Sequence, residues 1–253
     1  MSLNTVTLLL FSVIIKKMLE KNEKKLIFDA HFHYFECKKL GICEFPDGWS
    51  GISCAHSKEE WEVQKNAPSS VLKAYGIHPQ SCDFINIDEN ILFLENLIKS
   101  NEIVAIGEAG FDYFTDEFIQ NKDLQEKAWN EQLELAIQNQ MTLIIHCRKA
   151  NEKLFEYSNQ LKKVPEVLFH SFMGSFVEGK SLLSRGINGY FSFGKQIFNG
   201  NKKVLDCVRN LPPERVLAET DAPFQFLKGE KYTRPDEIVR IINGIKDLQR
   251  GQP

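Results

Sequence analysis

The sequence predicts an α/β protein that folds as a (β/α)8 barrel, the TIM barrel. Short apolar runs alternate along the chain with longer amphipathic segments, which is the pattern of successive strand and helix units around a parallel sheet. The 253 residues, of which 43% are hydrophobic, suffice for about eight such units and a large core. No glycine-rich loop follows the first apolar run, which disfavours a dinucleotide-binding fold.

The expected strands are short runs of apolar and β-branched residues, each bounded by polar or turn-forming residues. They cover residues 26–31, 52–55, 71–77, 103–107, 142–146, 166–170, 187–193 and 215–219. The run at 52–55 carries the weakest signal of the eight. Because parallel strands around a barrel all point the same way, the residues that end these runs should meet at one face.

Three helices have the clearest helical periodicity. In residues 123–140, apolar side chains recur at helical spacing among Gln, Glu and Asn, and residues 88–99 and 235–248 share the pattern, the last with a proline in its first turn. Residues 36–53 show no clear helix and contain Gly41, Pro46, Gly48 and Gly51. We therefore expect a barrel that is distorted around its second β/α unit.

The chain reads as one barrel domain, residues 26–253, preceded by an N-terminal extension, residues 1–25. Residues 3–15 are apolar, but no basic residue precedes them, Lys16 and Lys17 follow them, and they are too short to span a bilayer. We expect neither export nor membrane insertion.

Charge and cysteine content exclude other classes. A formal charge of −3 leaves no broad basic surface for a polyanion, so any nucleic-acid contact should be local. The six cysteines lack the dense spacing of a secreted disulfide scaffold, which favours reduced thiols and a cytoplasmic protein. A structural zinc site at Cys37, Cys43, Cys54 and His56 is disfavoured because close Cys-x-x-Cys pairs are missing.

Metal-binding residue types gather where the predicted strands end. Four of the six histidines, His31, His33, His146 and His170, lie there, and His31 and His33 share one face of an extended segment. Each position alone could be an ordinary structural residue, but four independent coincidences are improbable. With Glu108 and Asp221, which also follow apolar runs, they suit one or two divalent ions of magnesium, manganese or zinc.

Six ligands predict two ions bridged by Glu108, a pair that acidifies a shared water and so favours hydrolysis. Asp221 would bind one ion and also act as the general base toward that water. For substrate binding, His78 ends another strand and Arg148 could offer its guanidinium to a phosphate, although Arg148 could equally pair with a nearby acid.

These residues occur in blocks that resemble, in order, the signatures of the TatD family of metal-dependent deoxyribonucleases. The blocks are Asp29-Ala30-His31-Phe32-His33, Gly76-Ile77-His78-Pro79, Gly107-Glu108-Ala109-Gly110-Phe111-Asp112-Tyr113, Ile145-His146-Cys147-Arg148, His170-Ser171-Phe172-Met173-Gly174-Ser175 and Glu219-Thr220-Asp221-Ala222-Pro223. The resemblance implies that His31, His33 and Asp221 hold one ion, that His146 and His170 hold the other, and that Glu108 bridges them.

The implied activity is hydrolysis of phosphodiester bonds, usually of DNA from a 3′ end, with DNA ends or short nucleotides as substrates and no obligate protein partner. The chain departs from the family pattern at Ala30, Phe32 and Phe111, in the region 36–53, and after residue 248, where members carry a further helix. Two alternatives stay open: a metal-dependent amide, ester or lactone hydrolase on the same barrel, and a binding scaffold without activity.

Overall fold

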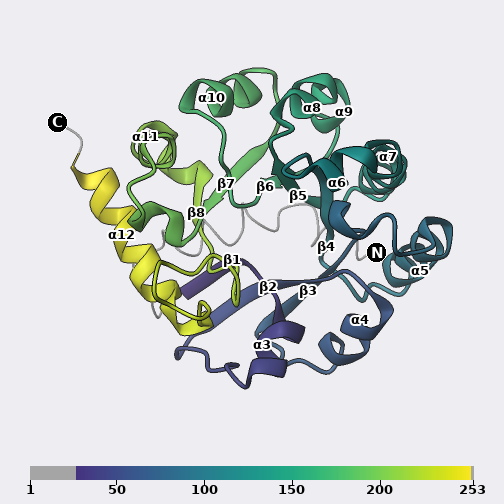
Figure 1. Cartoon of the computed structure of the whole chain (residues 1–253), viewed down its shortest axis with the longest axis horizontal. Coiled ribbons are helices and arrows are strands. Elements are labelled where there is room, and N and C mark those ends of the chain that lie inside the picture. Colours follow the sequence, from purple (N-terminus) through teal and green to yellow (C-terminus); the bar gives the residue numbers. More distant parts are fainter. Residues whose placement is uncertain (1–26, 252–253) are drawn as a thin grey trace, which may run out of the picture.

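Eight parallel strands, hydrogen-bonded in sequence order, form the centre of the molecule (Figure 1). The structure is a computed structural model in which residues 27–251 are described. The strands are β1 (Ile27–Phe32), β2 (Trp49–Ala55), β3 (Val71–Tyr75), β4 (Ala105–Asp112), β5 (Thr142–Arg148), β6 (Val167–Phe169), β7 (Gly189–Phe193) and β8 (Val216–Ala218). The predicted (β/α)8 architecture is confirmed, including the weak strand near residue 52.

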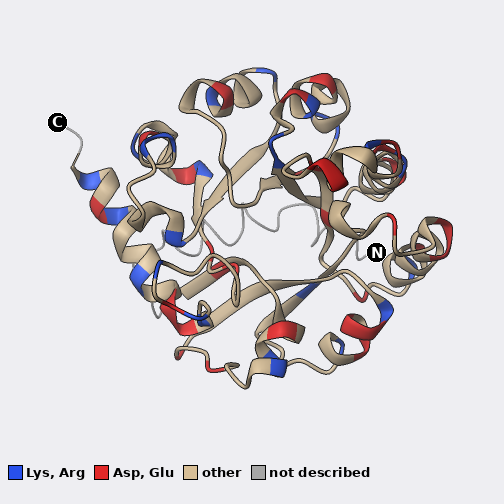
Figure 2. Ribbon diagram, in the orientation of Figure 1, with Lys and Arg blue, Asp and Glu red and all other residues tan. Residues whose placement is uncertain are grey.

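Helices surround the strands, and charges of both signs are distributed over them (Figure 2). They are α3 (Tyr34–Leu40), α4 (Lys58–Gln64), α5 (Ile87–Lys99), α6 (Asp116–Gln120), α7 (Lys122–Gln138), α8 (Asn151–Glu156), α9 (Ser158–Leu161), α10 (Phe176–Ser184), α11 (Lys202–Asn210) and α12 (Ile238–Arg250), with short 3-10 turns η1 (Pro79–Ser81), η2 (Lys195–Phe198), η3 (Pro213–Arg215) and η4 (Pro235–Glu237). The three helices expected from periodicity are present as α5, α7 and α12.

The prediction that residues 36–53 contain no helix is wrong, although residues 41–48, between α3 and β2, do lie outside helices and strands as expected. A helix, α3, occupies residues 34–40 and ends at Gly41, whose left-handed φ of 69° lets its N–H reach the carbonyls of Cys37 and Lys38. Gly51 lies inside strand β2 and not in a loop. A glycine is needed at this strand position because the ring of Trp49 fills the space that a Cβ would occupy. A second helix, α4, follows β2 and is capped by Ser57.

The barrel closes between its first strand and the segment that follows its last. The backbone N–H of Asp221 donates to the carbonyl of His31 at 3.0 Å, and the N–H of His33 donates to the carbonyl of Ala222 at 2.8 Å. These two bonds join the beginning and the end of the barrel at its carboxyl end. They bring His31, His33 and Asp221 together although they are about 190 residues apart in sequence.

Two apolar layers hold this frame. Side chains that fill the barrel interior are Phe28, Ala30, Ile52, Cys54, Ala74, Ala105, Ile144, Leu168, Tyr190 and Leu217. A larger layer lies between the strands and the helices and contains the fully buried Trp129 of α7. The interior is therefore a packed core that leaves only the carboxyl ends of the strands open for a site.

Helix α7 also contributes a buried polar anchor. Gln132 accepts the N–H of Ile77 at 2.7 Å and donates to the carbonyl of Ile77 at 3.1 Å, just beyond the end of β3. Both backbone groups of this buried residue are thus satisfied by one amide. The same turn continues to His78, so the anchor holds one of the predicted substrate-binding residues.

Replacing Gln132 with leucine is expected to lower the free energy of unfolding by about 2 to 4 kcal/mol, since it leaves the buried N–H and carbonyl of Ile77 unpaired. Denaturant titration followed by circular dichroism measures this loss. Gln138→Leu, on the exposed face of the same helix, is the matched control and should change stability by less than about 0.5 kcal/mol. Equal losses in both variants would contradict the anchoring role.

The N-terminal extension predicted at residues 1–25 lies outside the described residues. Between residues 27 and 251, no helix is both long and apolar enough to cross a membrane.

Candidate metal centre

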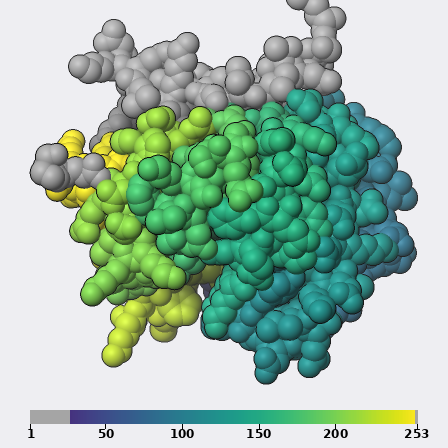
Figure 3. All heavy atoms as spheres, turned by 90° about the horizontal axis from the view of Figure 1, so that it is seen from above, coloured from purple at the N-terminus to yellow at the C-terminus, as the bar shows by residue number. Residues whose placement is uncertain are grey.

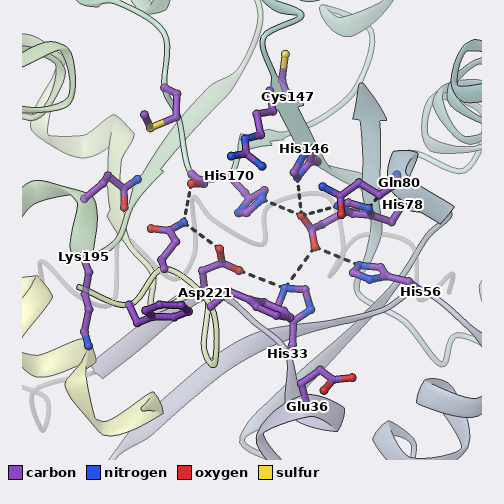
Figure 4. A pocket seen from close by; sticks show the side chains of 18 of the residues that line it. His33, Glu36, His56, His78, Gln80, His146, Cys147, His170, Lys195 and Asp221 are labelled. Carbon is purple, nitrogen blue, oxygen red and sulfur yellow. Dashed lines mark hydrogen bonds and ion pairs between the residues drawn. The ribbon is translucent and has the colours of Figure 1, made fainter. Parts of the chain in front are cut away.

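All six histidines of the chain gather at the carboxyl ends of the strands. A cavity of about 610 Å³ opens there, and its polar lining includes His33, His56, His78, Glu108, His146, His170 and Asp221. His31 lies fully buried beside Glu108. Figure 4 shows the labelled side chains of His33, His56, His78, His146, His170 and Asp221 converging on the cavity. The space-filling view shows a notch at its lower edge between the yellow-green and teal parts of the chain (Figure 3).

Glu108 reaches the centre of this cluster because of an irregularity in β4. Strand β4 carries one extra residue relative to β5 between Ile106 and Ala109, which is a β-bulge. The prediction that the strand stops at residue 107 is therefore wrong, since it continues to Asp112. Gly110 makes the close pairing possible: its φ is 143°, and a Cβ there would collide with the carbonyl oxygen of His146.

The two carboxylate oxygens of Glu108 face two separate sets of imidazoles. Its Oε1 lies close to three Nε2 atoms, those of His56 (3.1 Å), His31 (3.2 Å) and His33 (3.6 Å). Its Oε2 lies close to His170 Nε2 (2.8 Å), His146 Nδ1 (3.4 Å) and His78 Nε2 (3.9 Å). A buried carboxylate with imidazoles on both sides has the arrangement of a bridge between two cations.

Asp221 stands on the Oε1 side of this arrangement. Its Oδ1 is 3.2 Å from His33 Nε2 and 3.5 Å from His31 Nε2. Its Oδ2 accepts a hydrogen bond of 2.9 Å from Gln225, which also donates to Ser171. One oxygen of Asp221 therefore faces the cluster, and the other is fixed by the loop that follows β8.

A second set of carboxylates orients the histidines from behind. Asp112 Oδ2 lies 3.0 Å from His146 Nε2 and accepts from Gln80, while Glu219 Oε2 lies 3.5 Å from His170 Nδ1. Asp29 accepts from the backbone and hydroxyl of Thr220 and so ties β1 to the end of β8. A carboxylate that hydrogen-bonds the second ring nitrogen of a ligating histidine fixes its ring orientation, as Asp112 does for His146.

Burial and charge displace the pKa values of the cluster. Burial acts to raise the pKa of Glu108, but the charges of His31 and His170 outweigh it and hold that pKa well below its usual range. Burial acts to lower the pKa of His170, yet the charges of Glu108 and Glu219 raise it well above its usual value. Burial and the neighbouring His146 lower the pKa of His78. The carboxylates thus make most of the site favourable to positive charge.

Several buried polar atoms here have no hydrogen-bond partner. They are Glu108 Oε1, His56 Nε2 and His170 Nδ1. Buried polar atoms without a partner are costly. His170 Nδ1 faces Glu219 behind the cluster, but Glu108 Oε1 and His56 Nε2 face each other within it, and a cation bound by both would remove that cost. Four groups of three residues bring possible ligand atoms within 4.8 Å of one another, and Glu108 belongs to three of them. The residues therefore fit divalent metal ions.

All eight sequence-predicted site residues border this centre, although not all point into it. His78 accepts from the N–H of Gln80, which fixes its Nε2 toward Glu108. Arg148 is exposed at the mouth, where its guanidinium lies 3.4 Å from the centre of the Phe114 ring. In residues 27–251 it forms no ion pair with an acid, so the acid-pairing alternative is not observed.

Four further residues contact this centre that were not predicted from the sequence: His56, Asp112, Glu219 and Gln225. Asp112 and Glu219 lie inside the motif blocks, so closeness to a predicted ligand was an available signal. His56 follows β2 as His31 ends β1, but it had been grouped with the cysteines. The six cysteines are free thiols, and the sulfur of Cys147 contacts Asn151 instead of the histidines.

Comparisons with known proteins show which family the chain resembles. The sequence model of the family described as TatD related DNase matches residues 15–252. An uncharacterized metal-dependent hydrolase of Mycoplasma genitalium is 30% identical over 244 residues, covering 88% of this chain and 91% of the relative. A protein named 3′-5′ ssDNA/RNA exonuclease TatD, from Escherichia coli, is 29% identical, covering 80% of this chain and 81% of the relative.

Two solved structures share the fold. A crystal structure of a TatD homolog from Escherichia coli superimposes with a TM-score of 0.77 at 24% identity, covering 90% of this chain and 91% of that one. A TatD family hydrolase from Entamoeba histolytica gives a TM-score of 0.69 at 19% identity, covering 89% and 92%.

Proposed function

This chain belongs to the TatD related DNase family of metal-dependent hydrolases, and we propose from that premise that it is a deoxyribonuclease that trims DNA ends or short nucleotides. The observation that carries the proposal is the double-sided environment of Glu108, with three imidazoles facing each oxygen. Two divalent ions, of magnesium, manganese or zinc, would be held by His31, His33, Glu108 and Asp221 on one side and by Glu108, His146 and His170 on the other.

When bound, the two ions would supply Lewis-acid polarisation of the phosphate and acidify a water molecule. Asp221 would serve as the general base toward the attacking water. Burial acts to raise its pKa, but the hydrogen bond with His33 and the charges of nearby imidazoles outweigh it, so the pKa of Asp221 lies below its usual value. The side chain is therefore ionised at neutral pH and can accept a proton. Gln225 holds it in place.

The mouth of the cavity supports a nucleic-acid substrate. Arg148 and Lys149 lie against Phe114 on one side, and Phe224 (46% exposed) and Phe226 (55% exposed) line the cavity. Exposed aromatic rings stack with bases of any sequence, and a guanidinium donates to phosphate. Residues of both charge signs are mixed over the surrounding helices (Figure 2). We therefore expect the protein to contact only the end of a DNA strand, at the mouth of the cavity.

His78 and Arg148 are the proposed substrate-binding residues. The lowered pKa of His78 keeps its imidazole neutral, so it binds a phosphate oxygen as a neutral donor, while Arg148 supplies the charge. Such a charged group at the mouth favours a phosphodiester over the neutral amide, ester or lactone of the alternative hydrolase. The free cysteines support a reducing, cytoplasmic location.

The test is an end-labelled DNA assay. Protein stripped of metal and then supplied with magnesium, manganese or zinc is given single-stranded oligonucleotides labelled at the 5′ or the 3′ end. We expect metal-dependent shortening of the 5′-labelled strand and immediate release of the 3′ label as a mononucleotide. If two ions bind but no phosphodiester is cut, while nitrophenyl esters or lactones are hydrolysed, the nuclease proposal is wrong and the carbonyl hydrolase replaces it.

A further inference from the structure

We propose that His56 is a ligand of the metal ion on the Oε1 side of Glu108, which makes this side a nitrogen-rich position built from His31, His33 and His56 with two carboxylates. The proposal rests on the metal centre proposed above and adds a ligand that the motif blocks do not contain. A third imidazole at this side of Glu108 would also favour transition-metal ions over magnesium.

The contacts of His56 place it among the ligands. Its Nε2 is 3.1 Å from Glu108 Oε1, closer than His31 at 3.2 Å or His33 at 3.6 Å. Neither this nitrogen nor this oxygen has a hydrogen-bond partner, although both are buried. His33, His56 and Glu108 also form one of the groups whose ligand atoms lie within 4.8 Å of one another. A cation bound by both atoms would satisfy both of them, which supports a place for His56 among the ligands.

The local fold holds His56 in this orientation. It is the first residue after β2, and its backbone N–H donates to Glu60 Oε2 at 2.9 Å, within helix α4. The same oxygen lies 4.0 Å from His56 Nδ1, on the side of the ring away from Glu108. A histidine that binds a metal through Nε2 is commonly oriented by a carboxylate near its other nitrogen. Glu60 is in position to do this.

The alternative role for His56 is a substrate contact, as proposed for His78. The two rings are neighbours, with centroids 5.0 Å apart, and their side chains are similarly buried, 16% and 13% exposed. Their distances to Glu108 differ: 3.1 Å for His56 and 3.9 Å for His78. His78 Nδ1 is also occupied by the N–H of Gln80. His78 also forms a group of possible ligands with Glu108 and His146. However, because its Nδ1 accepts a hydrogen bond, its neutral ring carries the proton on Nε2 and faces Glu108 as a donor, so we assign His56 rather than His78 to the metal.

The added nitrogen changes the preferred ion. Magnesium binds through oxygen ligands and retains several waters, whereas three imidazoles suit zinc, cobalt and other borderline transition ions. The Oε1 position should therefore discriminate against magnesium. The Oε2 position, without His56, should discriminate less.

The experiment measures metal binding directly, without an activity assay. Cobalt(II) is titrated into metal-free wild type, His56→Ala and His78→Ala, its visible absorption spectrum is recorded, and affinity is obtained by competition with a chelator. We expect two ions in the wild type. In His56→Ala, one ion should bind at least about tenfold more weakly, with a changed spectrum, and added imidazole should restore it. His78→Ala should retain the wild-type affinity and spectrum.

Two further measurements keep the result interpretable. The metal-free variants should unfold at the same temperature as the metal-free wild type. If His56→Ala is unstable, His56→Asp is measured in its place; its carboxylate supplies an oxygen ligand, so it should keep part of the wild-type metal affinity. If His56→Ala binds two ions with unchanged affinity and spectrum, His56 is no ligand and the inference is overturned. If the wild type itself binds no cobalt, the metal centre and the proposed function fail first.

Discussion

A Glu108→Gln variant is expected to lose both metal ions and all metal-dependent hydrolysis. Glu108 is 2% exposed and supplies the only carboxylate whose two oxygens each face three imidazoles in the described part of the chain. The glutamine amide has nearly the same shape as the carboxylate but carries no charge. Its NH2 group is a hydrogen-bond donor, so one of the two sets of imidazoles would face a donor where the wild type presents a ligand oxygen. Affinity for each ion should fall by more than about 100-fold, since even residues behind the ligands account for 10- to 100-fold.

Metal content after dialysis, measured by mass spectrometry of the metal, tests this expectation. Asp112→Asn is the matched control because it makes the same chemical change in a buried carboxylate that touches only His146 among the histidines. It should retain two ions, with weaker affinity on the Oε2 side alone. Two tightly bound ions in Glu108→Gln would show that the carboxylate does not bridge them.

An Asp221→Asn variant is expected to bind oligonucleotides normally but to cleave them about 100- to 10,000-fold more slowly, the range associated with loss of a general base. The amide still fits beside His33 and Gln225, but it cannot accept a proton. Because Asp221 would also bind an ion, the rates are compared under single-turnover conditions at metal concentrations that saturate both proteins.

A Gln225→Ala variant distinguishes the role of the Asp221 carboxylate from that of the hydrogen bond that orients it. It removes the donor to Asp221 Oδ2 but leaves the carboxylate, so the rate should fall by a smaller factor than in Asp221→Asn. If Asp221→Asn at full metal occupancy cleaves DNA as fast as the wild type, another group takes the proton.

The eight strands and the three main helices of the barrel could be predicted because apolar runs and helical periodicity are local properties of the sequence. The errors occurred where local composition gives the opposite signal. Gly51 is typical of a loop by composition, yet it lies in β2, where the ring of Trp49 leaves no space for a larger residue. Glu108 interrupts an apolar run, and only the bulge against β5 shows that the strand continues past it.

The gathering of the histidines could be predicted from strand ends, but their division between the two oxygens of Glu108 could not. His56 was grouped with Cys37, Cys43 and Cys54 because they are near in sequence, whereas the barrel turns its ring toward residues from other strands.

The closure of the barrel has a consequence for the order of events during synthesis. His31 and His33 lie at the end of the first strand, whereas Asp221 and Ala222 follow the last, and the two backbone bonds between these pairs form only when both segments are present. A nascent chain that has emerged from the ribosome only as far as β7 therefore has no complete position on the Oε1 side. A metal ion at the proposed position would therefore bind only after completion of the barrel and, by favouring the closed form, would oppose its reopening at the seam between the first and last strands.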